Sequence, residues 1–522
     1  MSPRRYSIES QTFEDLITEN LVYVDKTELV YNLAQHKRIF LSRPRRFGKS
    51  LLCSTLKSYF EGRKDLFAGL AMEKLETEWV EYPVIHLDFS DDKSGNYANM
   101  NKTISDMLEV YEKKYDAPEV EEKTFYNIRF RNIVESAYEK TGKKVVIIID
   151  EYDSLMLNVI DNDEKQNEVR TTMNNLFSPI KNLDPKLRFV FITGITKFSQ
   201  MSIFSALNNL YDISLEPEYE GICGITKEEM TTVLKEDLEA FAIKNKITYE
   251  QAVKKFKERY DGYHFSTEKQ DIFNPFSVLN ALNSKQLKNY WFKSGTPSSL
   301  IKLINKFSID MPRLNNVRCT IERFDQPVEK VTDLIPLLYQ SGYITIKNYN
   351  ERREEFTLGF PNREVKMSFA DSLMKYAYQR DEDINDYMAS AYKDLKLDGD
   401  IPGFMKYLNL FYRKFPFSLI NQNEKHYHSV LYTILSSYGA DVVANPESAK
   451  GRADLLLRFD DVNYVFELKL DGKTRAALDQ IDDKDYIAVA IEPGKKIIKL
   501  AINFSITDRC ILDWDVDDGF EF

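Results

Sequence analysis

The chain has 522 residues, of which 43% are hydrophobic and 13% aromatic, and its formal net charge at pH 7 is -11. Because one domain usually holds about 100 to 200 residues, this length predicts roughly two to four domains. The composition is typical of a globular protein and argues against long disordered segments. The acidic charge excludes broad attraction to nucleic acid, since that affinity comes from Lys and Arg side chains that neutralise phosphates. Any contact with nucleic acid is therefore expected to be local or aided by metal ions.

Neither a membrane segment nor a cysteine framework is predicted. No apolar run approaches the roughly 20 residues of a membrane-spanning helix, and the opening MSPRRYSIES lacks the apolar stretch of a secretory signal. We therefore expect a cytoplasmic protein with no membrane partner. The four cysteines contain no C-x-x-C pair, so we interpret them as reduced packing residues and predict no zinc site or disulfide. His36, His86 and His264 show no metal-like clustering and are interpreted as packing or surface residues.

Residues 38–52, RIFLSRPRRFGKSLL, have the pattern of a strand, a proline-containing loop and a helix. The loop ends in Gly48, Lys49 and Ser50, the last residues of the phosphate-binding pattern G-x-x-x-x-G-K-[ST]. Free N–H groups and the dipole at a helix start attract phosphate, Lys49 can reach the outer phosphates, and the Ser50 hydroxyl can ligate Mg²⁺. The segment predicts a nucleotide site, and the alternative is a helix start that is merely rich in basic residues.

Arg43 stands where that pattern has its first glycine. The glycine permits a tight backbone turn, and we expect Pro44 and a rearranged loop to supply the turn instead. Arg45 and Arg46 add positive charge beside the predicted phosphate site.

The segment KKVVIIIDEYD predicts a buried strand that ends in Asp150 and Glu151. Asp150 can hold the Mg²⁺ shell, and Glu151 is placed to polarise the water that attacks the terminal phosphate. The segments YPVIHLDFS and LRFVFITGITKFS predict two further parallel strands. Ligands of open α/β sheets lie at the carboxyl ends of the strands, so the Thr193 hydroxyl is a candidate phosphate sensor. An acidic turn and a structural threonine are the alternatives.

RPRRFGKSLL, IIIDEYD, FITGITKFS, YDGYHF at 260–265 and SGTPSSL at 294–300 together resemble the AAA-ATPase-like proteins of bacteria, which carry a PD-(D/E)XK nuclease domain at the C-terminus. The resemblance covers most of the chain and includes the arginine in place of the first glycine. It implies that Gly48, Lys49 and Ser50 bind nucleotide, with Asp150 and Glu151 as the metal and water partners.

The predicted fold class is α/β, with a parallel-sheet P-loop ATPase at the N-terminus and a PD-(D/E)XK nuclease-like domain at the C-terminus. Between them, ITKEEMTTVLKEDLEAFAIKN predicts helices with a Thr226 cap, and LLYQSGYITIKNYNERREEFTLGF predicts two strands around a charged turn. The second segment resembles a winged-helix module, which either binds DNA or packs on the ATPase. The predicted domains are an ATPase core at 1–220, a helical lid at 221–285, a winged-helix-like module at 286–365, a helical connector at 366–415 and the nuclease-like domain at 416–522.

Residues 453–459 and 463–470 are strand-like and are joined by a polar turn at Asp460 and Asp461, which predicts a hairpin. Side chains alternate along a strand, so Glu467 and Lys469 share one face, and a turn centred between the two aspartates places Asp454 opposite Glu467. Carboxylate oxygens suit Mg²⁺ or Mn²⁺, and Lys469 can orient or deprotonate an attacking water. The alternative is a strand that is decorated with alternating charges.

This hairpin resembles the nuclease motif of the same family, with Asp454, Glu467 and Lys469 at its metal and catalytic positions and Gln480 on the following helix. Glu424 and Glu447 are candidates for a third metal ligand. His426 and His428 point in different directions on a helix, so we interpret them as solvent-facing or helix-capping residues.

These sites predict an ATP-binding, ATP-regulated nuclease that uses ATP and Mg²⁺ or Mn²⁺ and acts on nucleic acid, with DNA favoured over RNA. The alternative is a nucleotide-dependent switch or assembly scaffold whose nuclease fold binds without cleaving. A homo-oligomer is possible, because many P-loop ATPases complete their site with a neighbour's arginine.

Overall fold

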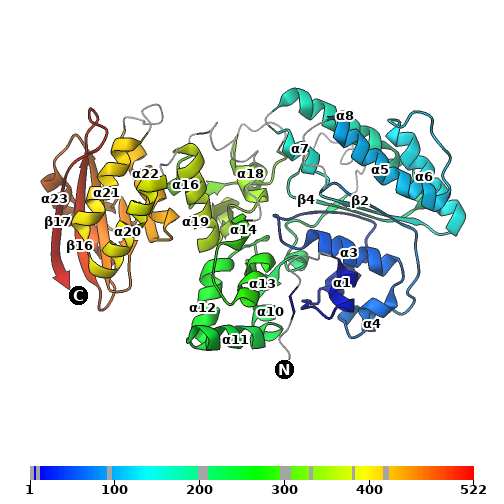
Figure 1. The fold of residues 1–522 in the computed structure, drawn as a ribbon, viewed down its shortest axis with the longest axis horizontal. Helices are drawn as coiled ribbons and strands as arrows, with labels where there is room; N and C mark the ends of the chain where they lie inside the picture. The colour runs from blue at the N-terminus through cyan, green and yellow to red at the C-terminus, as the bar shows by residue number, and fades with distance from the viewer. Residues whose placement is uncertain are drawn as a thin grey trace. The chain divides into compact units, whose positions relative to one another are not determined.

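The computed structural model divides into two compact units (Figure 1). Unit 1 comprises Met1–Ser299 and Val317–Glu364, and unit 2 comprises Leu300–Asn316 and Val365–Phe522. The described residues are 5–6, 12–90, 97–160, 162–197, 210–293, 307, 309–328, 333–378, 382–415 and 423–521. The SGTPSSL motif at 294–300 therefore lies outside the described residues.

Unit 1 is built on a parallel five-stranded sheet with the strand order β2-β3-β4-β1-β5. The central strands β3 and β4 are rich in β-branched and aromatic residues and are almost completely buried, as parallel strands covered on both faces require. β4 lies between β1 and β3, so the phosphate-binding loop and the acidic strand do not come from neighbouring strands. The strands are β1 (Arg38–Ser42), β2 (Val84–Asp88), β3 (Val145–Asp150), β4 (Leu187–Gly194) and β5 (Tyr211–Asp212).

Helices cover both faces of this sheet, with α5, α6 and α8 on one face and α1, α3 and α4 on the other (Figure 1). α3 starts directly after the phosphate-binding loop, so the loop is held between a central strand and a buried helix. The helices are α1 (Phe13–Thr18), α2 (Thr27–Ala34), α3 (Lys49–Phe60), α4 (Ala71–Leu75), α5 (Tyr97–Tyr115), α6 (Tyr126–Thr141), α7 (Ser154–Asn158) and α8 (Asp163–Phe177).

The next part of unit 1 is helical, as the sequence predicts. Thr226 caps α10 through a capping box with Glu229, which confirms the predicted cap. These helices share a core that includes Leu238, Phe256 and Leu282. The elements are β6 (Ile225–Thr226), α10 (Lys227–Thr232), α11 (Lys235–Asn245), α12 (Tyr249–Tyr260), β7 (Ile272–Phe273), α13 (Pro275–Ser284) and α14 (Tyr290–Lys293).

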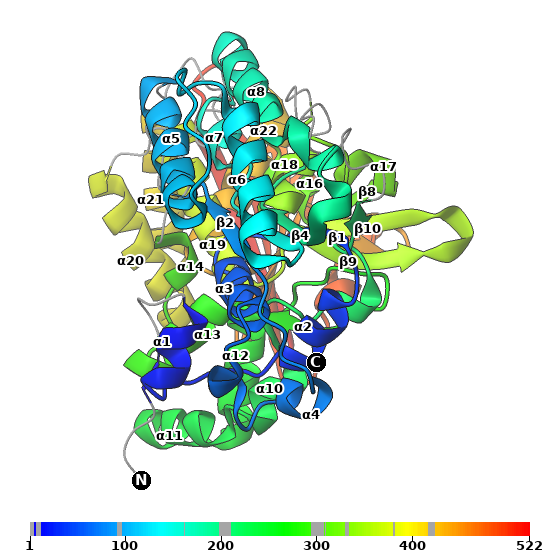
Figure 2. The same ribbon diagram turned by 90° about the vertical axis from the view of Figure 1, so that its right-hand side faces the viewer.

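Unit 1 ends in a three-stranded antiparallel sheet with the order β8-β10-β9. β9 and β10 form the predicted hairpin around the charged turn, and this hairpin extends away from its neighbours (Figure 2). The elements are β8 (Val317–Cys319), α17 (Ile321–Phe324), α18 (Ile335–Gln340), β9 (Thr345–Asn350) and β10 (Glu355–Gly359).

Unit 2 contains a second five-stranded sheet with the order β11-β14-β15-β16-β17, in which only the β15–β16 pair is parallel. α23 packs on one face through Ala477 and Ile481, and α21 and α22 pack on the other, where Tyr412 and Tyr427 contact Phe504. The strands are β11 (Asp441–Ala444), β14 (Leu455–Arg458), β15 (Val462–Leu470), β16 (Lys496–Phe504) and β17 (Ile511–Glu521). The helices are α16 (Met311–Leu314), α19 (Arg363–Ser372), α20 (Glu382–Asp398), α21 (Ile401–Lys414), α22 (Glu424–Ser437) and α23 (Thr474–Asp483).

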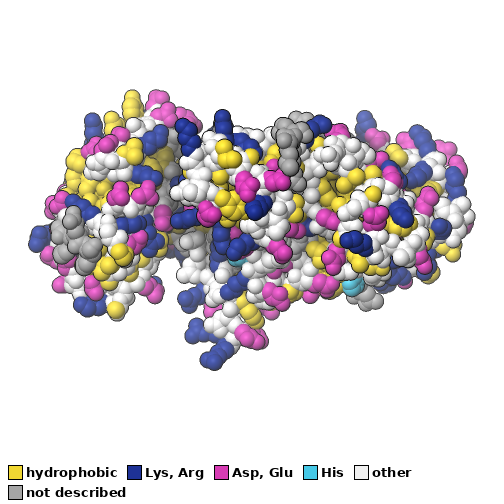
Figure 3. Space-filling view, turned by 90° about the horizontal axis from the view of Figure 1, so that it is seen from below, with side chains coloured by type: hydrophobic (Ala, Val, Ile, Leu, Met, Phe, Trp, Pro, Cys, Tyr) yellow, Lys and Arg dark blue, Asp and Glu magenta, His cyan; other side chains and the backbone are white. Residues whose placement is uncertain are grey.

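The surface mixes charges of both signs. On the face shown in Figure 3, Lys and Arg side chains lie among Asp and Glu side chains over most of the surface. This distribution agrees with the expectation that any contact with nucleic acid is local. Among the described residues, no helix combines the length and apolar character that crossing a bilayer requires.

Candidate nucleotide and nuclease sites

The loop between β1 and α3 has the backbone that phosphate binding requires. Gly48 precedes α3 with a φ of +93°, a conformation that L side chains rarely adopt, so a glycine is needed there. The N–H groups of the first turn of α3 follow it, beginning with those of Lys49 and Ser50. The Lys49 ammonium is buried and donates to the carbonyl of Pro44 at 3.2 Å. A bound phosphate would offer this ammonium a charged acceptor in place of that carbonyl.

Arg43, at the position of the missing glycine, is a buried cross-link. Its guanidinium donates to the carbonyls of Ser42 at 3.0 Å, Ser214 at 2.7 Å and Tyr219 at 3.2 Å. The same group lies over the Phe265 ring, 4.2 Å from the ring centroid. Only 1% of the side chain is exposed, and burial lowers the pKa of this arginine. The residue therefore ties the loop to the segments that follow β5 and α12.

Arg45 and Arg46, which we predicted to bind the cofactor, differ in their surroundings. Arg45 is half-buried, and its carbonyl accepts a hydrogen bond from Trp291 Nε1 at 3.0 Å. Arg46 is exposed, and its guanidinium lies 4.8 Å from the centroid of the Phe276 ring. The Arg46 backbone has a φ of +65°, which is uncommon for a residue other than glycine. Their predicted roles in nucleotide binding stay predictions.

Residues far along the chain cover the same loop. The Phe47 ring packs edge-on against Tyr263 and Phe265, with centroids 4.7 and 5.5 Å away. A Cβ built on Gly342 would lie 2.6 Å from Pro44 Cβ, so this position must lack a side chain. The loop therefore contacts Tyr263 and Phe265, which precede β7, and the segment around Gly342 that leads into β9. Phe276 and Trp291, which follow β7, contact it as well.

The carboxylate of Asp150 is fully buried at the end of β3. Its Oδ1 accepts from the Glu151 N–H at 2.9 Å, and the nearby Ser50 hydroxyl lowers the pKa of this carboxyl. Burial raises the pKa of Asp150 to about 7, and the influence of Ser50 and Lys49 only partly opposes this rise. Glu151 has a φ of +48°, an unusual conformation for its residue type. The structure thus brings Ser50, Lys49 and Asp150 together, as the sequence predicts.

Thr193 is fully buried in β4, and its hydroxyl donates to the Leu41 carbonyl at 2.8 Å. A phosphate-sensing role for Thr193 stays a prediction and would require its hydroxyl to leave this partner. Sequence reasoning missed Asp153, whose buried carboxylate accepts from the Thr196 N–H at 2.6 Å and the Thr196 hydroxyl at 2.7 Å. Asp153 joins the end of β3 to the end of β4, and the only sequence signal is a third acid in DEYD.

In unit 2 the hairpin register agrees with the predicted one. Leu455 pairs with Phe466 and Arg458 with Asn463, so the turn is centred between Asp460 and Asp461. Continuing this register by one residue places Asp454 opposite Glu467. The Leu468 N–H donates to Asp454 Oδ2 at 2.7 Å, which holds the aspartate against β15.

Glu467, Lys469 and Gln480 form one hydrogen-bonded group. Lys469 Nζ donates to Glu467 Oε1 at 2.9 Å and to Gln480 Oε1 at 2.7 Å. Glu467 is 3% exposed, and burial followed by repulsion from Asp454 raises its pKa, while Lys469 opposes the rise. Burial likewise raises the pKa of Asp454. Two carboxyl groups and an ammonium therefore face the same space.

Of the two candidates for a third metal ligand, only Glu424 acts on this group. Glu424 is itself exposed, but partial loss of solvent raises its pKa, repulsion from Asp454 adds to the rise, and Lys469 opposes it. Glu447 is exposed and instead pairs with Arg452, with its Oε1 3.0 Å from the guanidinium. The geometry favours Glu424, and the ligand role itself stays a prediction.

The interpretation of His428 as solvent-facing or capping is wrong. Its side chain is 7% exposed, and its Nε2 lies 2.9 Å from the Asp454 carbonyl oxygen. Because a carbonyl only accepts, Nε2 must carry the proton. His426 lies elsewhere, edge-on to Phe415, and burial lowers its pKa to about 4. Helical periodicity correctly predicts that the two side chains diverge, but it does not predict the contact with Asp454.

Comparison with known proteins agrees with this geometry. A family described as "Predicted AAA-ATPase" matches residues 6–204, and the "PD-(D/E)XK nuclease superfamily" matches residues 422–514. An "Uncharacterized protein in vnfD 5'region" of Azotobacter chroococcum mcd 1 is 30% identical over 529 residues, which span 99% of this chain and 99% of the relative. The chain belongs to the family of predicted AAA-ATPases with a C-terminal PD-(D/E)XK nuclease domain. The family resemblance and the fold class predicted from the sequence are thereby confirmed.

In this AAA-ATPase-like protein, one buried carboxylate oxygen at each candidate site suits a divalent cation. Asp150 Oδ2 and Glu467 Oε2 have no hydrogen-bond partner among the described residues. A buried acceptor without a partner is costly, and a bound cation would satisfy it. Ser50 and Asp150 fit the Mg²⁺ that accompanies a nucleotide, and Asp454 and Glu467 fit a second ion.

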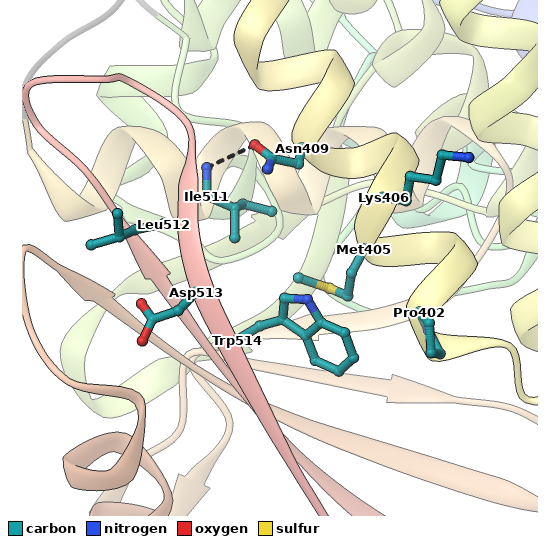
Figure 4. A pocket seen from close by; sticks show the side chains of 8 residues that line it. All are labelled: Pro402, Met405, Lys406, Asn409, Ile511, Leu512, Asp513 and Trp514. Atoms are coloured by element: carbon teal, nitrogen blue, oxygen red, sulfur yellow. Dashed lines mark hydrogen bonds between the residues drawn. The ribbon is translucent and has the colours of Figure 1, made fainter.

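Unit 2 of this family member also contains a cavity of about 400 Å³ (Figure 4). Trp514, one of its lining residues, pairs with Ile502, and Ile502 pairs with Leu468. Leu468 lies on the opposite face of β15 from Glu467 and Lys469, because side chains alternate along a strand. The cavity therefore lies on the α21 side of the sheet. It is lined by Pro402, Met405, Lys406, Asn409, Ile511, Leu512, Asp513 and Trp514.

Proposed function

We propose that this AAA-ATPase-like protein is a metal-dependent nuclease that hydrolyses phosphodiester bonds, with DNA as its favoured substrate, under the control of ATP. The observation that carries the proposal is the convergence of Asp454, Glu467 and Lys469, with Lys469 Nζ held by Glu467 at 2.9 Å and by Gln480 at 2.7 Å. An alternating charge pattern on a surface strand would not bury Glu467 to 3% exposure.

In this proposal Asp454, Glu467 and Glu424 hold Mg²⁺ or Mn²⁺, whose charge would stabilise the developing negative charge on the scissile phosphate. Lys469 orients the attacking water as an ammonium or, when neutral, accepts a proton from that water at Nζ. Gln480 fixes the ammonium, because its Oε1 accepts from Nζ while its amide nitrogen donates to the Tyr486 hydroxyl at 3.3 Å. His428 and the Leu468 N–H hold Asp454 in place.

At the nucleotide site, Gly48, Lys49 and Ser50 bind the phosphates, Asp150 and Ser50 hold the accompanying Mg²⁺, and Glu151 polarises the attacking water. Support comes from the influence of Ser50 and Lys49 on the pKa of Asp150 and from the burial of Lys49. Phosphate binding replaces the contact of Lys49 with the Pro44 carbonyl.

The same loop offers a physical route for regulation. Pro44 contacts Gly342, and the Arg45 carbonyl contacts Trp291, so a shift of the loop on phosphate binding acts on both segments. Gly342 leads directly into the β9–β10 hairpin, which precedes unit 2 in the chain. We propose that ATP alters cleavage through this connection.

The cleavage test compares duplex DNA, single-stranded DNA and RNA with Mg²⁺ or Mn²⁺. The parent protein is expected to cut DNA faster than RNA, and Lys469→Ala is expected to lose activity by about 100-fold or more, as loss of a general base does. Lys495→Ala is the matched control, because Lys495 pairs with Glu492 in the same domain. A Lys469→Ala variant that cuts as fast as the parent refutes the assignment.

Regulation is tested by measuring cleavage with and without ATP in the parent and in Lys49→Ala. The parent is expected to respond to ATP, and the variant is expected to lose both ATP binding and the response. ATP binding without cleavage of any nucleic acid would favour the alternative, a nucleotide-dependent switch or scaffold with a binding module.

A further inference from the structure

Cys53, His86 and Asp150 meet behind the nucleotide site, although they come from three separate elements of unit 1. Cys53 lies in α3, His86 in β2, and Asp150 at the end of β3. One donor atom of each, the Cys53 Sγ, a His86 ring nitrogen and an Asp150 oxygen, lies within 4.8 Å of the other two. Among the described residues, this is the one group of three or more such side chains that meets this distance.

Sheet topology produces the convergence. β2 and β3 are parallel, with His86 opposite Ile148 and Asp88 opposite Asp150. Side chains alternate along a strand, so His86 and Asp150 lie on the same face of the sheet. α3 packs on this face, and Cys53 is fully buried there.

Two of the three groups have donor or acceptor capacity left over. His86 Nε2 and Asp150 Oδ2 are buried, and neither has a hydrogen-bond partner among the described residues. Asp150 is 0% exposed, so water does not reach this oxygen from the surface. Buried polar atoms are nearly always paired in native proteins, so an ion bound by both atoms would remove the cost of leaving them unpaired.

The donor set decides which ion fits. A thiolate, an imidazole and a carboxylate suit a borderline-soft transition ion such as Zn²⁺, whereas Mg²⁺ prefers oxygen alone. Ligand atoms around tetrahedral Zn²⁺ lie about 3.5 Å apart, so the three side chains need to close by about 1 Å. Three protein ligands leave a fourth position open.

We propose that Cys53, His86 and Asp150 form a binding site for a divalent transition metal ion of the Zn²⁺ type, and that this ion competes with Mg²⁺-nucleotide for Asp150. Ser50 and Asp150 together are proposed to hold the nucleotide's Mg²⁺, so a transition metal ion on Asp150 removes one of these two ligands. The competition rests on the proposed nucleotide site, whereas the transition-metal site does not.

The test uses the full chain, freed of metal with a chelator, and titrates it with Co²⁺ and Zn²⁺. Co²⁺ bound to a thiolate absorbs in the near ultraviolet, and the nuclease site has no cysteine, so the two metal sites are distinguishable. We expect one Co²⁺ per chain with this absorption, which Zn²⁺ displaces. Cys53→Ala is expected to abolish the absorption, and His86→Gln is expected to weaken Co²⁺ binding at least about 10-fold.

Cys319→Ala is the matched control, because Cys319 is buried in β8, and it is expected to bind Co²⁺ as the parent does. His86→Gln is expected to leave the fold intact, because the backbone at this position is held independently of the side chain. The His86 N–H donates to the Tyr111 hydroxyl at 2.8 Å, and that hydroxyl donates to the His86 carbonyl at 2.8 Å. A parent protein without the thiolate absorption, or a Cys53→Ala variant that retains it, overturns the site.

Competition has its own measurement. Mg²⁺-ATP is expected to weaken Co²⁺ binding at least about 10-fold in the parent, because both ions need Asp150. In Lys49→Ala this effect is expected to disappear while Co²⁺ binding persists, which separates the metal site from the nucleotide site. If ATP binds to the parent and the affinity for Co²⁺ is unchanged, the proposed competition for Asp150 is contradicted.

Discussion

The guanidinium of Arg43 lies 4.2 Å from the centroid of the Phe265 ring and donates to three backbone carbonyls, those of Ser42, Ser214 and Tyr219. A glycine at this position in the usual phosphate-binding pattern has no side chain and makes none of these contacts. The arginine has therefore exchanged a flexible turn for a cross-link that fixes the loop from its first residue.

Restoring the usual glycine is expected to destabilise the protein. Arg43→Gly leaves three carbonyls without their donor and opens a cavity beside Phe265, so we expect a loss of about 3 to 5 kcal/mol in the free energy of unfolding. Arg46→Gly in the same loop is the matched control, because Arg46 is exposed and has a φ of +65° that glycine adopts freely. Denaturant unfolding measures both, and an Arg43→Gly variant as stable as Arg46→Gly contradicts the cross-link.

Local sequence predicts the parts of each site that depend on local spacing. The strand, loop and helix around Gly48, and the hairpin centred between Asp460 and Asp461, follow from the period of the pattern and the position of the turn. The partners of Arg43 could not be predicted, because Ser214 and Phe265 are distant in the chain and meet it only after the sheet forms.

Contacts between residues distant in the chain also explain why the sequence alone indicates no metal site at Cys53 and His86. Zinc sites are recognised in sequence by closely spaced ligands, whereas Cys53, His86 and Asp150 lie on three elements that the parallel sheet brings together. His428 is a similar case, since its contact with Asp454 joins a helix to a strand that follows it much later.

Burial of Asp150 predicts a pH-dependent cost to stability. Its pKa rises from 3.8 to about 7 on folding. Below 3.8 the carboxyl is protonated in both states. From there to about 7 only the unfolded chain ionises, so stability falls as the pH rises, and above about 7 the cost is constant.

Asp150→Asn removes this ionisation while keeping an oxygen acceptor. In metal-free protein we expect the variant to be more stable than the parent by about 2 to 4 kcal/mol above about pH 7, with a smaller difference toward about pH 4. Calorimetric unfolding over this range measures it, with the exposed Asp460→Asn as the control. If the difference in stability between variant and parent does not depend on pH, the burial of an ionising carboxylate is contradicted. Mg²⁺-ATP is expected to reduce this difference in stability, because it binds tightly only to the parent and stabilises it.

The two candidate third ligands predict opposite behaviour. Glu424 interacts with Asp454 and Lys469, whereas Glu447 pairs with Arg452 on the surface. We expect Glu424→Gln to raise the Mg²⁺ or Mn²⁺ concentration for half-maximal cleavage about 10-fold or more. Glu447→Gln should leave this concentration unchanged. Equal effects of the two substitutions would remove Glu424 from the metal site.

We expect His428 to act as a positioning residue, because its Nε2–H donates to the backbone carbonyl of Asp454 at 2.9 Å. His428→Phe removes the donor, so Asp454 gains freedom, and we expect kcat for cleavage to fall about 10-fold with little change in KM. His428→Gln keeps an N–H donor and should recover part of the rate. His426→Phe is the matched control, since His426 contributes a ring contact with Phe415 that phenylalanine retains. If His428→Phe and His426→Phe have the same kcat, then Leu468 alone holds Asp454 in place.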